Sequence, residues 1–111
     1  MTKYLLIDED DNHAGCLASR LSRPETRIER VVSANEAMTR LRGAAGGYDL
    51  VIVNVSGNYE PWVPILRKLL EASRQPALGT MPAFLCVSTA RRSPEFELQL
   101  ERMGLRYVFE R

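Results

Sequence analysis

The sequence predicts an α/β domain built on a doubly wound parallel sheet, and three observations lead to this fold class. Short apolar runs of strand type alternate with amphipathic helical segments along the chain. The strand–helix pattern occurs four times and ends on a strand, which is typical of parallel strands joined by right-handed crossovers. The chain has 111 residues, 45% of them hydrophobic, which is the size and composition of one globular domain.

The expected strands are short apolar runs bounded by polar or turn-forming residues. Most are continuously apolar, as expected for strands that are buried on both faces. "RIERVV" alternates before it ends apolar, which places this strand nearer the edge of the sheet. The five strands are expected at 3–7, 27–32, 49–54, 83–88 and 106–109.

The expected helices carry start signals. Ser33 and Glu36 have the spacing of a capping box. Ser93 is an expected N-cap, with Pro94 at the first helical position, where a missing N–H costs little. The third helix has two prolines in its first turn. The four helices are expected at 12–23, 33–43, 61–74 and 93–104.

Composition excludes several classes of function. The formal net charge is +1, so no strong field recruits nucleic acid or an acidic membrane. No apolar run approaches the ~20 residues that a membrane helix needs. "MTKYLLIDEDD" places acids directly behind a short apolar run, which indicates a strand and its turn, not a signal peptide. Cys16 and Cys86 lie in apolar patterns, so we expect both to be reduced core residues in a cytoplasmic protein.

The polar residues that follow the strands define the candidate site. In an open parallel sheet, ligands bind beyond the carboxyl ends of the strands, at the point where strand order reverses. Adjacent carboxylates there favour a hard cation such as Mg²⁺, although the acidic turn "DEDDN" alone is better explained as solvated. The residues expected to gather at this edge are Asp8, Glu9, Asp10, Asn54, Ser88, Thr89, Glu110 and Arg111.

Two further residues near this edge are open to more than one interpretation. His13, the only histidine, could act as a metal ligand or in phosphoryl relay, but it is better explained as a solvated residue in the first turn of a helix. Trp62, the only tryptophan, is either an exposed anchor for a partner or a residue packed at the start of the third helix.

In these segments the chain resembles the receiver domains of two-component response regulators. "KYLLIDEDD" resembles the opening of that family, where two adjacent acids help to hold Mg²⁺, and "YDLVIVNVSG" resembles the segment that carries the phosphoryl-accepting aspartate. "STA" is similar to the hydroxyl-plus-alanine step, and "GLRYVFER" to the last-strand motif that ends in lysine. The resemblance covers nearly the whole chain. It implies a flavodoxin-like three-layer α/β/α fold with strand order 2-1-3-4-5.

The resemblance assigns individual positions and also exposes departures. An asparagine at the acceptor position is a poor nucleophile, because its amide oxygen is uncharged. Arginine in place of lysine keeps the charge but loses the compact ammonium contact. Val108 stands where many family members place a switch aromatic. The assigned positions are Asp8 and Glu9 for metal, Asn54 for the acceptor, Thr89 or alternatively Ser88 for the hydroxyl, and Arg111 for the lysine.

We therefore expect a receiver-like signalling domain of a phosphorelay, a pseudo-receiver that regulates through protein contacts without aspartate phosphorylation. The resemblance implies no enzyme activity, a weak Mg²⁺ site at most, and a sensor kinase, an output domain or a second copy of the chain as partner. The family usually ends in a fifth helix, which is missing here. We expect residues 1–111 to be the N-terminal part of a longer protein.

Two other functions fit parts of the sequence. Asp8-x-Asp10 after an apolar strand is similar to the first motif of haloacid-dehalogenase-type phosphatases, with Asp8 as nucleophile and Asp10 as general acid/base. The later acidic pair of that family is missing, and the chain is short for it. The third alternative is a plain dimerisation module of receiver shape.

Overall fold

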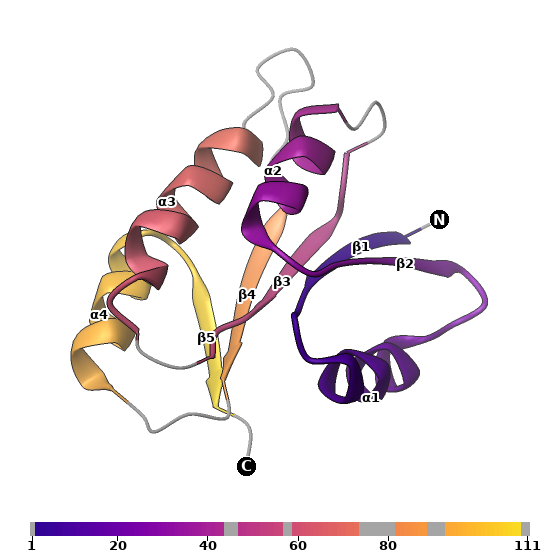
Figure 1. Ribbon diagram of the computed structural model, residues 1–111, viewed down its shortest axis with the longest axis horizontal. Coiled ribbons are helices and arrows are strands. Elements are labelled where there is room, and N and C mark those ends of the chain that lie inside the picture. Colours follow the sequence, from indigo (N-terminus) through magenta and orange to yellow (C-terminus); the bar gives the residue numbers. More distant parts are fainter. Residues whose placement is uncertain (1, 44–46, 57–58, 74–81, 89–92, 110–111) are drawn as a thin grey trace.

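The computed structural model describes residues 2–43, 47–56, 59–73, 82–88 and 93–109, and every structural statement below concerns these residues. They form five strands and four helices in strict alternation (Figure 1). All nine elements lie within two residues of the ranges expected from sequence. Their bounds are β1 Thr2–Ile7, α1 Asp11–Leu21, β2 Thr26–Val31, α2 Ala34–Gly43, β3 Leu50–Asn54, α3 Trp62–Ser73, β4 Ala83–Ser88, α4 Pro94–Arg102 and β5 Arg106–Phe109.

The five strands form one sheet in the order β2-β1-β3-β4-β5, and every neighbouring pair is parallel. The expected fold class and strand order are thus confirmed. The chain moves from β1 outward to β2, crosses back to β3, and continues outward through β4 to β5. Strand order reverses between β1 and β3, so the carboxyl ends of these two strands mark the crevice where ligands bind in such sheets.

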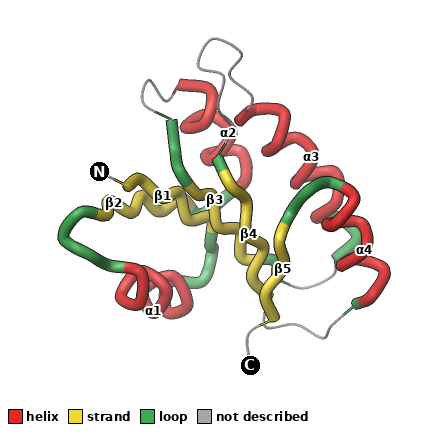
Figure 2. Tube along the Cα trace, turned by 180° about the vertical axis from the view of Figure 1, so that it is seen from behind, coloured by secondary structure: helices red, strands yellow, loops and turns green. Residues whose placement is uncertain are grey.

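Side chains of successive strand residues point to opposite faces, and this alternation builds two apolar layers. Leu5 and Val51 belong to the cluster under α2, α3 and α4, whereas Leu6 and Ile52 belong to the cluster under α1. Figures 1 and 2 show α1 apart from the group formed by the other three helices. The sheet is therefore the central layer of a three-layer domain.

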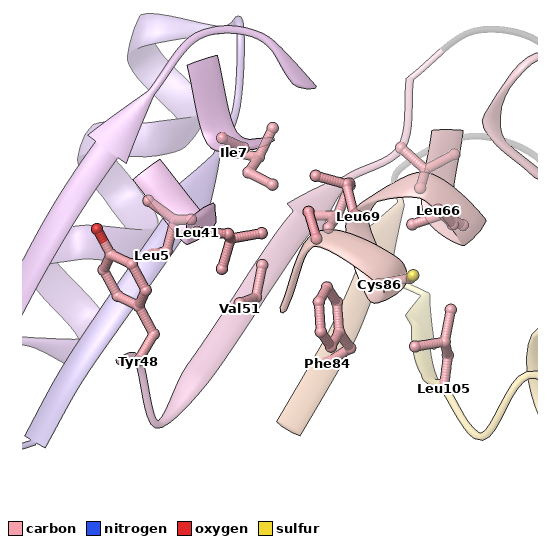
Figure 3. Close-up of a cluster of buried hydrophobic side chains, with 14 of the residues drawn as sticks. Leu5, Ile7, Leu41, Tyr48, Val51, Leu66, Leu69, Phe84, Cys86 and Leu105 are labelled. Atoms are coloured by element: carbon pink, nitrogen blue, oxygen red, sulfur yellow. The ribbon is translucent and has the colours of Figure 1, made fainter. Parts of the chain in front are cut away.

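The larger cluster forms the main hydrophobic core. Figure 3 shows its leucine, valine, phenylalanine and cysteine side chains between the sheet and the helices. Leu66 and Leu69 of α3 are fully buried, and burying a leucine side chain contributes about 1.5–3 kcal/mol. These contacts hold α3 against β3 and β4, and so fix the helix that begins beside the carboxyl edge of the sheet.

The expected start signals of two helices are present. Ser33 Oγ accepts from the backbone N–H of Glu36 at 3.2 Å. The Glu36 carboxylate reaches back to the N–H of Val32 at 3.2 Å, one residue earlier than in a standard capping box. Ser93 Oγ accepts from the N–H of Phe96 at 3.3 Å, which confirms the expected N-cap of α4. These side chains satisfy N–H groups that the helices themselves leave unpaired.

One prediction about the cysteines was wrong. Cys86 is fully buried, as expected, and burial raises the pKa of its thiol to about 12. Cys16 is exposed. On α1 the buried positions are Ala14 and Leu17, and Cys16 lies on the solvent side of that helix. An apolar residue beside an apolar stripe was mistaken for a member of it.

Among the described residues, no helix combines the length and the apolar character needed to cross a membrane.

Candidate functional site at the carboxyl edge of the sheet

The pairing of β1 with β3 brings the first two candidate residues together. Ile7 lies opposite Val53 in the parallel register, so the next residues, Asp8 and Asn54, lie side by side at the carboxyl edge. By alternation both side chains belong to the α1 face, as do Leu6 and Ile52 before them. The amide Nδ2 of Asn54 donates to Oδ1 of Asp8 at 2.8 Å. The structure thus brings together these two residues, which the sequence placed at the ends of strands one and three.

The carboxylate of Asp8 is buried, and three N–H donors reach its two oxygens. The residue is 1% exposed, and Oδ1 also accepts from the backbone N–H of Asp10 at 2.9 Å. Oδ2 lies 2.5 Å from Nδ1 of His13, and because a carboxylate offers only acceptors, the imidazole N–H is the donor. A buried carboxylate without such partners would be costly, so these three donors are what allow the side chain to sit inside the domain.

His13 is not the solvated residue that the sequence suggested. Its side chain is only 16% exposed, and it lies against Asp8. The cause is local: Asp10 caps α1 by accepting from the backbone N–H of His13 at 3.1 Å. That cap fixes the first turn of the helix so that the imidazole at its third position folds back over the end of β1.

Arg30 of β2 clamps the turn that carries the site. Its Nε and Nη2 both donate to the carbonyl oxygen of Asp8, at 3.0 and 2.8 Å. Its Nη1 donates to Oδ1 of Asp11 at 2.6 Å. One planar guanidinium therefore holds both the end of β1 and the start of α1, which is a geometry that a lysine ammonium does not reproduce.

Glu9 belongs to a second set of contacts. It is exposed, and its carboxylate accepts from the hydroxyl of Ser56 at 3.0 Å. The carbonyl oxygen of Ser56 in turn accepts from the indole N–H of Trp62 at 2.9 Å. Trp62 is partly buried and packs against the main core cluster. Of the two interpretations of Trp62, the structure favours the packed one, and the residue links α3 to the acidic turn.

The remaining candidates are placed less closely or fall outside the described residues. Ser88 is fully buried at the end of β4. Asn54 pairs with Val87, whose side chain packs under α1, so alternation directs the Ser88 side chain to the opposite face from Asn54. Thr89, Glu110 and Arg111 lie outside the described residues.

The chemistry of this pocket is that of a closed polar network. Its central side chain, Asp8, has both oxygens in use, and its neighbour Asn54 presents an amide N–H to it. The described residues contain no group of three or more acidic, histidine or cysteine side chains that could hold a metal ion. Asp8 and Glu9 remain the only acidic ligands expected from sequence, and a divalent cation would have to displace N–H donors from Asp8. The pocket therefore fits such a cation only weakly.

Sequence reasoning missed Arg30 and misjudged His13. For Arg30 a signal was present, since a charged residue near the apolar end of a strand needs a partner. For His13 the signal was its spacing, three residues after the capping aspartate, which places it in the first turn beside the end of β1. Neither pattern is specific enough to identify the contact without the strand register.

Comparisons with known proteins bear on the fold. No protein-family profile matches the chain, and no curated protein sequence matches it significantly. Solved structures do. A response regulator from Burkholderia pseudomallei with a phosphorylated aspartic acid, a calcium ion and citrate has a TM-score of 0.69 at 18% identity. That match covers 99% of this chain but only 60% of the other, so this chain spans less than two thirds of that protein.

Two further solved structures are also similar to this chain. A putative pilus assembly-related protein from Burkholderia pseudomallei has a TM-score of 0.71 at 23% identity, covering 97% of this chain and 76% of that one. The receiver domain of the histidine kinase CKI1 from Arabidopsis thaliana, complexed with Mg²⁺ and BeF3⁻, has a TM-score of 0.65 at 15% identity, covering 97% and 80%. At such identities a likeness establishes fold and not activity. The chain has the flavodoxin-like fold of receiver domains.

Proposed function

We propose that the chain is a receiver-type signalling domain that regulates a partner through protein contacts, without phosphorylation of an aspartate at the end of β3. The single observation that carries this proposal is the hydrogen bond from Asn54 Nδ2 to Asp8 Oδ1 at 2.8 Å. It supports the proposal because Asn54, the residue that the receiver resemblance assigns to the acceptor position, directs its amide N–H toward the acidic turn.

Phosphoryl transfer to this position would need an anionic oxygen. In an aspartate, a carboxylate oxygen attacks phosphorus, the bond to the leaving group breaks, and an acyl phosphate forms. The amide of Asn54 has no anionic oxygen, and its nitrogen lone pair is delocalised into the carbonyl group, so neither atom is a good nucleophile. Asp8 does not substitute for it, because its side chain is buried and both of its oxygens accept hydrogen bonds.

The same contacts disfavour the phosphatase alternative. A nucleophilic Asp8 needs an oxygen that can approach a phosphate ester, and the side chain of Asp8 is 0% exposed. Asp10, the general acid/base of that alternative, is occupied as the N-cap of α1. We therefore assign no enzyme activity to the domain, and propose a cytoplasmic location and a sensor kinase, an output domain or a second copy of the chain as its partner.

The test is phosphorylation by a small phosphodonor. The native protein and an Asn54→Asp variant are incubated with acetyl phosphate and Mg²⁺, and their intact masses are measured. We expect no phosphoryl adduct on the native chain. A parallel sizing experiment, with and without beryllofluoride and Mg²⁺, is expected to leave the association state of the native protein unchanged.

The variant shows whether the rest of the pocket is still competent. An adduct on Asn54→Asp alone means that the asparagine is what prevents phosphorylation of the native chain. An adduct on the native chain, at any residue of this edge, overturns the proposal.

A further inference from the structure

The donors around Asp8 raise the question of what balances this carboxylate. A carboxylate buried in a domain must be neutralised or hydrogen-bonded, and a divalent cation is one way to achieve this. Here Oδ1 accepts from the Asn54 amide and the Asp10 backbone, at 2.8 and 2.9 Å, and Oδ2 faces the imidazole of His13 at 2.5 Å. Protein donors therefore already occupy both oxygens.

The imidazole of His13 contacts Oδ2 of Asp8, the carboxylate oxygen that Asn54 does not contact. Its backbone is fixed by the Asp10 cap, and its side chain is largely removed from solvent. A divalent cation takes oxygen ligands, so it would reach Asp8 at a carboxylate oxygen, either directly or through a water that it carries. A cation and the imidazole N–H thus compete for Oδ2.

We propose that His13 blocks this oxygen, and that His13 and Asn54 together replace a divalent cation as the partners of Asp8. The pocket then keeps its shape with no metal bound, and His13 is the residue that lowers its affinity for Mg²⁺. The inference deepens the proposed function and rests on it for the identity of the pocket. Its test uses no phosphodonor, so the two can fail separately.

The protein carries its own reporter for this test. Trp62 is the only tryptophan, and its indole N–H donates to the carbonyl of Ser56, whose hydroxyl donates to Glu9. A cation that draws Glu9 toward Asp8 disturbs this chain of contacts. The fluorescence of Trp62 should therefore follow cation binding at the acidic turn.

The experiment is a MgCl₂ titration at constant ionic strength, followed by Trp62 fluorescence in four proteins. The native protein is expected to bind weakly. His13→Ala removes the donor, and we expect its Mg²⁺ affinity to rise by about tenfold or more, equal to about 1.4 kcal/mol or more. His13→Asn keeps an N–H at the δ position and should bind as weakly as the native protein. Ser19→Ala, on the exposed side of α1, is the matched control and should also resemble the native protein.

The inference is overturned if His13→Ala binds Mg²⁺ no more tightly than the native protein, or if His13→Asn binds as tightly as His13→Ala. Should the alanine variant fail to fold, the native protein still answers the question. It has a single histidine, so the NMR signals of one imidazole can be followed as Mg²⁺ is raised. Displacement of His13 must move these signals with the same midpoint as the Trp62 signal. Binding that leaves the imidazole unchanged contradicts the proposal.

Discussion

Replacing Asn54 by aspartate should destabilise the domain strongly, and the size of the effect follows from one contact. Nδ2 of Asn54 lies 2.8 Å from Oδ1 of Asp8. In the variant, two carboxylates at that separation repel by about 6 kcal/mol if the effective dielectric constant is ~20. The native hydrogen bond, worth about 1.5–3 kcal/mol to a charged acceptor, is lost as well.

Proton uptake limits this penalty. Two carboxyl groups at so short a distance share one proton. At neutral pH, binding that proton costs about 4 kcal/mol at most, because each pH unit above an ordinary carboxyl pKa corresponds to about 1.4 kcal/mol. We therefore expect Asn54→Asp to lower the free energy of unfolding by about 4 kcal/mol at neutral pH. The folded variant holds a proton that it releases on unfolding, so its stability relative to the native protein recovers as the pH falls toward about 4.

The assay is urea unfolding in metal-free buffer, followed by far-ultraviolet circular dichroism at several pH values. Asn54→Ala is the matched control, because it removes the hydrogen bond without adding charge. We expect it to cost about 1–3 kcal/mol, with little dependence on pH. If the aspartate and alanine variants have the same stability at neutral pH, and neither varies with pH, Asn54 does not face Asp8 and the geometry argued here is wrong.

Three other predictions test separate parts of the structure. Arg30→Ala should lower the free energy of unfolding by about 2 kcal/mol, and Arg30→Lys should recover less than half of that loss, because one ammonium cannot replace the guanidinium contacts to the acidic turn; urea unfolding measures both. Burial and the hydrogen bond to Glu29 raise the pKa of Tyr48 to about 12. Because of this raised pKa the folded state keeps the phenol proton to higher pH than the unfolded state does, so the free energy of unfolding should fall between pH ~10 and ~12. An ultraviolet titration should show one tyrosine that ionises at higher pH than the others, and Tyr48→Phe should remove that transition. In the native protein a thiol reagent should modify Cys16 rapidly and Cys86 only after unfolding; equal rates would contradict the assigned burial.

The fold could be predicted from the sequence because its signals are local and repeated. A short, continuous apolar run such as that of β4 is typical of a strand in a sheet that is buried on both faces. The N-cap at Ser93 fixed the start of α4 from three residues alone. Strand order followed from the resemblance, since alternation by itself leaves several orders open.

The site was predicted only in outline, because its contacts depend on register and on helix phase. That Asp8 and Asn54 meet follows from parallel strands of similar length, and this could be stated in advance. That the imidazole of His13 turns inward depends on which residue caps α1, which a one-residue shift would reverse. Cys16 depends on helix phase in the same way. It was expected in the core, but its position beside Leu17 on α1 places it at the surface.

The most direct test of the account is the side-chain amide of Asn54 observed by ¹⁵N NMR. We predict a pair of NH₂ signals protected from exchange with water, shifted by Asp8→Asn, and unchanged when acetyl phosphate is added to protein that is already in Mg²⁺. An amide that exchanges as rapidly as one in solvent, or one whose signals change when the phosphodonor is added, would contradict it.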